Sequence, residues 1–145
     1  MLRAFLFPMI FAIATSSFAV SSTADHPGAS MTLQSDKGRY VVRVEPPTAA
    51  PPINQLHSWK IKLSLIDGAP VNDARFKVDG GMPQHGHGLP TRPQVTRDAA
   101  DGTYRLDGVK FNMSGLWQMK FDIDSGAGAD AVTFNTVVRD PSDKR

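Results

Sequence analysis

The stretch of sequence that decides the fold is a run in which polar and apolar residues alternate strictly: His57-Ser58-Trp59-Lys60-Ile61-Lys62-Leu63-Ser64-Leu65. Successive side chains of a β-strand point to opposite faces of the sheet. The alternation therefore places the apolar side chains, from Trp59 to Leu65, on one face and the lysines on the other. We interpret this run as a strand with one buried face.

The same pattern returns at residues 116–123, where Trp117, Met119, Phe121 and Ile123 are expected to point inward. Shorter β-rich runs occupy residues 38–45, 74–78, 103–109 and 131–138, and the run at 74–78 is expected to stop at the glycine pair 80–81. Turn-forming residues separate these runs, and no segment keeps a helical period. The sequence predicts an all-β, immunoglobulin-like antiparallel β-sandwich of about seven strands.

The first 24 residues have the pattern of a secretory signal peptide. Arg3 precedes an apolar run at residues 4–14, which gives way to small polar residues. That run is shorter than the roughly 20 apolar residues that a membrane span needs. We expect cleavage after Ala19 or Ala24, export of the protein, and no stable membrane span afterwards.

The rest of the chain divides into a short leader and one domain. Residues 25–36 are small and polar, and we interpret them as a flexible lead-in to a domain at residues 37–140. Within that domain, residues 48–52 are rich in alanine and proline and predict a stiff extended connector.

The composition indicates in which compartment the protein works and which class of partner it does not bind. The chain has no cysteine, so an exported domain of this kind fits a bacterial periplasm better than a disulfide-rich extracellular space. Its 16 basic residues nearly balance 14 acidic ones and are scattered, which argues against nucleic acid as a partner.

An enzymatic function finds no support in the sequence. There is no cysteine nucleophile, no His-Glu-x-x-His zinc motif and no Gly-x-Ser-x-Gly elbow. The aspartates Asp67, Asp79 and Asp101 fall in predicted turns, where aspartate has an ordinary structural role. The cupin pattern also has two histidines one residue apart, but the glutamate that should follow is absent here.

The densest group of chemically active side chains lies in a glycine- and proline-rich loop at residues 81–93. Met82, His85 and His87 fall within six residues, and Met113 occupies a second turn just before the strand of Trp117. Imidazole and thioether are both good copper ligands, and together they form a softer set than zinc or magnesium sites use. Met82, His85, His87 and Met113 are therefore the candidate metal ligands, with copper as the candidate metal.

Ordinary structural roles compete with this interpretation. Histidines in glycine-rich loops often cap backbone groups or face solvent, and methionines commonly fill gaps in cores. Met119 shares a face with Trp117 and is expected in the core, and His57 is expected to be structural. His26 would chelate cupric ion beside a free amine only if cleavage follows Ala24.

Several motifs are spaced as in the YtkA-like family of exported bacterial domains, which this sequence resembles. The related FixH proteins of cytochrome oxidase assembly have a similar motif pattern. The motifs are Gly81-Met82-Pro83-x-His85-Gly86-His87-Gly88, Pro93, Gly102-x-Tyr104 and Phe111-x-Met113-x-Gly115-x-Trp117. The likeness spans roughly residues 59–138. It implies an immunoglobulin-like periplasmic domain that handles copper or another heavy metal, although FixH proteins keep a membrane anchor.

Two functions are therefore expected from the sequence. The first is an exported, periplasmic metal-binding domain that binds or delivers copper through its Met/His loop, with a periplasmic metalloprotein or an oxidase-assembly protein as partner. The alternative is a non-enzymatic binding or assembly module, similar to FixH, in which the same loop is a recognition surface without metal.

Overall fold

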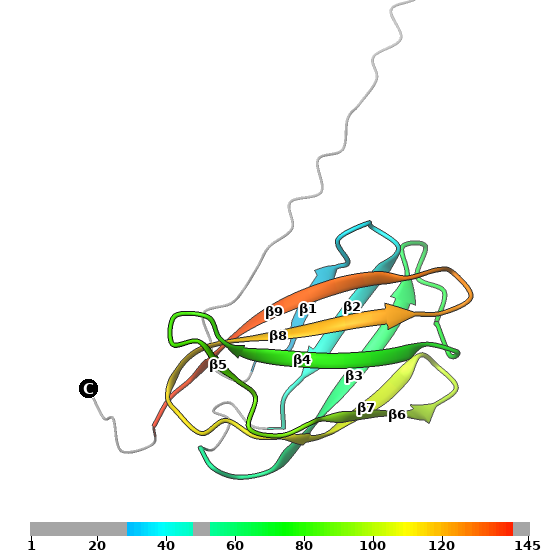
Figure 1. Ribbon diagram of the computed structural model, residues 1–145. Coiled ribbons are helices and arrows are strands. Elements are labelled where there is room, and N and C mark those ends of the chain that lie inside the picture. Colours follow the sequence, from blue (N-terminus) through cyan, green and yellow to red (C-terminus); the bar gives the residue numbers. More distant parts are fainter. Residues whose placement is uncertain (1–28, 48–52, 141–145) are drawn as a thin grey trace, which may run out of the picture.

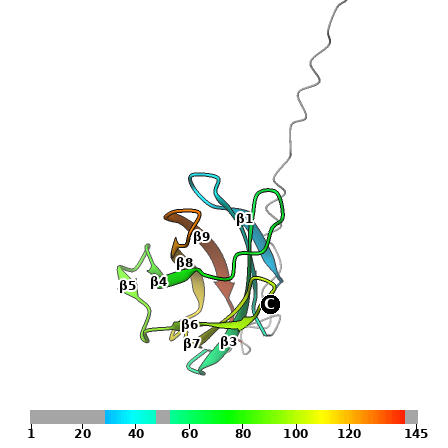
Figure 2. The same ribbon diagram turned by 90° about the vertical axis from the view of Figure 1, so that its right-hand side faces the viewer.

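The computed structural model describes residues 29–47 and 53–140, and these form two antiparallel β-sheets packed face to face (Figure 1). One sheet has the strand order β1-β2-β3-β7-β6 and the other β5-β4-β8-β9. Seen along the strands, the two layers enclose a single core (Figure 2). The strands are β1 (Met31–Gln34), β2 (Tyr40–Glu45), β3 (His57–Leu65), β4 (Arg75–Met82), β5 (His87–Gly88), β6 (Gln94–Ala99), β7 (Thr103–Val109), β8 (Gly115–Asp124) and β9 (Asp130–Val138).

The predicted all-β sandwich is confirmed, and so are the inward faces of its two central strands. On β3, Trp59, Ile61 and Leu63 are buried. On β8 the alternate residues from Trp117 to Ile123 are buried, which places Met119 in the core as expected. Each such side chain contributes roughly 1.5–3 kcal/mol by leaving water. These two faces form the centre of the core.

The described residues contain nine strands rather than about seven. β6 was not predicted because five of its six residues are exposed, so the strand has no buried face that would produce an apolar alternation. β5, which has only two residues, was not predicted either. The strand expected to stop at Gly80 and Gly81 instead continues through both glycines to Met82.

The expected flexible lead-in at residues 25–36 is wrong for its second half. Met31–Gln34 forms β1, which pairs with β2 and has Met31 and Leu33 packed against the core. Alternation over four residues was too short to recognise. The expected signal peptide at residues 1–24, His26 and the expected connector at residues 48–52 lie outside the described residues. In the part of the chain that is described, no helix is long and apolar enough to cross a bilayer.

A buried carboxylate closes one end of the sandwich. Asp130, at the start of β9, accepts hydrogen bonds from the Ser35 hydroxyl at 2.6 Å and from the backbone N–H groups of Lys37 at 3.0 Å and Arg39 at 3.2 Å. The backbone N–H of Asp36 donates to the carbonyl of Ala131 at 2.8 Å. Asp130 therefore fastens the β1–β2 turn of one sheet to the edge strand of the other.

These hydrogen bonds hold Asp130 in its ionised form. Burial alone would raise its pKa, but the hydrogen bonds from Ser35 and from the backbone outweigh burial and lower the pKa from 3.8 to about 2. The stability that this carboxylate adds is fully present above pH 3.8 and is lost as the pH falls towards 2.

We expect Asp130→Asn to lower the free energy of unfolding at pH 7 by roughly 2 kcal/mol, because an amide nitrogen would face backbone donors. Urea denaturation measures this change. Asp67→Asn is the matched control, since Asp67 is exposed and accepts only the Ala69 N–H in a turn. The wild-type protein should lose stability between pH 3.8 and 2 more steeply than Asp130→Asn. Equal slopes would contradict the structural role of the carboxylate.

His57 is structural, as the sequence predicted. Its Nδ1 accepts a hydrogen bond from Trp59 Nε1 at 3.0 Å, and its ring lies 5.4 Å from that of Phe111. An accepting Nδ1 places the proton of the neutral ring on Nε2, which is buried and has no hydrogen-bond partner among the described residues. Burial lowers the pKa of His57 from 6.5.

Because the unfolded chain takes up this proton first, acidification below pH 6.5 should destabilise the protein. We expect the free energy of unfolding to fall between pH 7.5 and 5.5 in the wild type and to fall less in His57→Gln. His85→Gln removes an exposed imidazole instead and should keep the wild-type fall. Chemical denaturation at a series of pH values tests this, and identical curves for wild type and His57→Gln would refute it.

Candidate metal centre

The loop that carries two of the candidate histidines is a tight hairpin between β4 and β5. Met82 and His87 are register partners, and the backbone N–H of His85 donates to the carbonyl of Met82 at 3.0 Å to close the turn. Gly86 follows with a φ of 65°, a conformation that glycine adopts without steric cost. The sequence thus produces a hairpin that displays His85 and His87 on either side of a glycine.

The glycine pair that precedes the hairpin lets β5 fold closely onto β4. A Cβ atom on Gly81 would lie 2.3 Å from the carbonyl oxygen of His87, closer than side chains can approach backbone. The backbone N–H of Leu89 donates to the carbonyl of Gly80 at 2.9 Å. A Cβ atom on Gly80 would lie 2.5 Å from the carbonyl oxygen of Gln118, so each glycine of the pair avoids a clash with a neighbouring strand.

The two histidines lie side by side and face solvent. Their ring centroids are 6.4 Å apart, and the ring planes differ by 20°. Two imidazoles bound to one ion through bonds of about 2 Å have ring centroids about 5–6 Å apart. The observed separation of the two centroids is slightly larger than this range.

The two methionines differ in their position and in their exposure: Met82 ends β4, and Met113 lies in the β7–β8 loop. Met82 is 2% exposed, and a Cβ atom on Gly115 would lie 2.7 Å from its Cε, so the methyl group packs against the β7–β8 loop. Met113, in that loop, is 37% exposed, and its carbonyl accepts a hydrogen bond from Trp117 Nε1 at 3.0 Å. The structure thus brings the two loops to one end of the sandwich (Figure 1).

A groove of about 340 Å³ runs beside the hairpin on the outer side of the four-stranded sheet. Met82 and His87 line it, whereas His85 and Met113 do not. Among the described residues, no three His, Cys, Asp or Glu side chains form a group that could hold a metal ion. Any ion at this end would therefore depend on thioether sulfur, carbonyl oxygen or water to complete the pair of imidazoles, and thioethers favour a soft ion such as copper.

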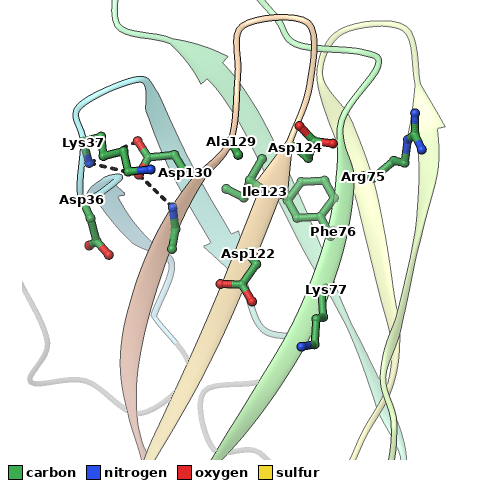
Figure 3. A pocket seen from close by; sticks show the side chains of 11 residues that line it. Asp36, Lys37, Arg75, Phe76, Lys77, Asp122, Ile123, Asp124, Ala129 and Asp130 are labelled. Atoms are coloured by element: carbon green, nitrogen blue, oxygen red, sulfur yellow. Dashed lines mark hydrogen bonds between the residues drawn. The ribbon is translucent and has the colours of Figure 1, made fainter.

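A second hollow, of about 490 Å³, lies near Asp130 and contains none of the candidate ligands (Figure 3). Phe76 and Ile123 form its apolar floor, and Arg75 and Asp124 stand at its rim. Basic and acidic side chains both line this hollow. Its most enclosed carboxylate, Asp130, already accepts hydrogen bonds from Ser35, Lys37 and Arg39. It adds no metal-binding side chain to the candidate site.

Two residues support the candidate ligands in ways that the sequence did not predict. Gly115 has a φ of 130° and provides the close contact for Met82, while Trp117 fixes the backbone of Met113. The only sequence signal was the spacing Met113-x-Gly115-x-Trp117, which does not show that Gly115 faces another loop.

The family model described as YtkA-like matches residues 32–122. No curated protein matches the sequence. The solved C-terminal domain of ZirS is 9% identical, with a TM-score of 0.42 over 95% of this chain and 88% of that one, and this likeness carries no functional argument. Since the family match extends over more than half of the chain and includes the hairpin of His85 and His87, the protein belongs to the YtkA-like family.

Proposed function

We propose that this protein is an exported, periplasmic metal-binding domain that binds copper reversibly at the hairpin end of the sandwich. His85 and His87 supply the nitrogen ligands, and Met82 and Met113 supply thioether sulfur. The protein has no catalytic role in this proposal. It buffers the ion or delivers it to a periplasmic metalloprotein or an oxidase-assembly protein.

The observation that supports this proposal best is the pair of exposed imidazoles whose centroids lie 6.4 Å apart on a tight hairpin. Both side chains are exposed, so solvent rather than packed protein surrounds them. The methionines add the second argument, because Met82 is paired in register with His87 and the loop of Met113 contacts Met82 through Gly115.

The proposed ligands differ in how readily they can bind and release the ion. The histidines are already exposed, so they would capture it first. The thioether of Met82 would have to turn away from Gly115, whereas Met113 is partly exposed and can approach from solvent. Such an open site at a loop suits exchange with a partner more than permanent storage.

The alternative, an assembly module without metal, also has a specific observation in its favour. Leu116 and Val137 are paired in register, are exposed and lie at the same end of the sandwich as Met113. Exposed apolar side chains beside a rigid hairpin are suited to protein recognition. The two functions differ in whether the histidines bind an ion.

Copper affinity decides between them. We expect wild-type protein, titrated anaerobically with cuprous ion against a chromophoric chelator, to compete for about one equivalent, and the double variant His85→Ala/His87→Ala to bind at least about tenfold more weakly. His57→Gln is the matched control because its imidazole is buried elsewhere, and it should bind like wild type. Equal affinity of the double variant and the wild type would favour the assembly module.

The thioethers are tested by metal selectivity. Leucine keeps most of the volume of methionine but cannot bind a metal, so Met113→Leu should weaken cuprous binding several-fold while leaving zinc binding nearly unchanged. Competition titrations with both ions measure these affinities. The indole of Trp117 donates a hydrogen bond to the Met113 carbonyl, so a change in its fluorescence on metal addition gives a second readout. An unchanged cuprous affinity would remove Met113 from the site.

A further inference from the structure

The last strand of the four-stranded sheet has a backbone edge that the β1–β2 turn covers at Ala131 and that is open from Thr133 onward among the described residues. β9 is at the end of the order β5-β4-β8-β9 and pairs with β8 along its full length (Figure 1). The carbonyl of Ala131 points away from β8, since it accepts the Asp36 N–H. N–H and C=O groups of alternate residues point the same way in an antiparallel strand, so those of Thr133, Asn135 and Val137 also face outward.

These outward groups have no hydrogen-bond partner within residues 29–47 and 53–140. The side chains of the same three residues are exposed on the outer face of the sheet, and none of them carries a charge. An edge of this length without charge, proline or bulge is the kind of edge that pairs with another strand.

The other sheet edges carry features that discourage pairing with another strand, namely charged side chains, a register shift or short length. β6 carries Arg97 and Asp98 and contains a register shift, and β1 has only four residues. On the far side of the four-stranded sheet, β5 pairs with the end of β4, and the rest of β4 bears Arg75, Lys77 and Asp79. Among the described strands, β9 alone combines length with an unprotected edge.

The edge is complementary to itself. A twofold axis through Asn135 places Thr133 opposite Val137 of a second copy, and about six backbone hydrogen bonds can form between the two strands. The paired segment ends before Ala131, because the Asp36 backbone of the same chain already occupies the position beside it and donates its N–H to the Ala131 carbonyl.

We propose that β9 pairs antiparallel with β9 of a second copy of this chain, forming a homodimer with one continuous eight-stranded sheet. Copper binding is not involved, because the hairpin of His85 and His87 lies at the opposite edge of the sheet. The uncharged outward residues favour this occupant, since a partner strand of the same composition places no like charges opposite one another.

Sedimentation velocity on the purified protein from about 10 μM to about 1 mM tests the proposal. We expect a concentration-dependent dimer of the wild-type chain. Asn135→Lys places two like charges at the axis without touching the β8 hydrogen bonds, so its dissociation constant should be at least about tenfold higher. Thr96→Lys adds the same charge to the edge of the other sheet and should dimerise like wild type.

A second variant tests the same edge without adding a charge. Asn135→Pro removes one outward N–H and no hydrogen bond to β8, so it should abolish the dimer and leave the unfolding midpoint of dilute protein unchanged. A wild-type protein that stays monomeric at about 1 mM, or an Asn135→Lys variant that dimerises as tightly, would overturn the proposal. A loss of monomer stability in Asn135→Pro would also overturn it, by showing that the edge is paired within one chain.

Discussion

The contact on which the architecture depends is the packing of Phe111 between two buried tryptophans from opposite sheets. Phe111 lies 6.3 Å from Trp59 of β3 and 5.0 Å from Trp117 of β8, measured between ring centroids. All three side chains are at most 1% exposed. Aromatic pairs at such distances add to the burial of their large surfaces. This cluster joins the two sheets at the end where the candidate ligands lie.

The candidate site is attached to that cluster through two short connections. Met82 packs against Gly115, two residues before Trp117, and the Trp117 indole donates to the carbonyl of Met113. The hairpin of His85 and His87 is attached in turn by the close approach of β5 to Gly81. A rigid core therefore positions two loops, while the imidazoles themselves remain exposed. This combination of a fixed base and exposed side chains is what the proposed reversible binding of a soft ion requires.

The sequence predicted the fold well where burial is one-sided. Strict alternation identified β3 and β8, including the core position of Met119, because those strands have one face in the core and one in water. Alternation did not identify β6, whose residues are mostly exposed on both faces, or β1, which is too short to show a period. It also ended β4 too early, because Gly80 and Gly81 resemble a turn until the contact with His87 is known. At the candidate site, the spacing identified the side chains of the hairpin but not the part played by Gly115, which depends on a contact with Met82 of another strand.

The central claim is that nitrogen and sulfur from these two loops bind one copper ion. X-ray absorption at the copper edge of the loaded protein measures the ligand set directly. The account predicts a single population of cuprous ion with both imidazole nitrogen and thioether sulfur in its coordination shell. A shell of nitrogen and oxygen alone, or no copper retained after buffer exchange, would contradict it.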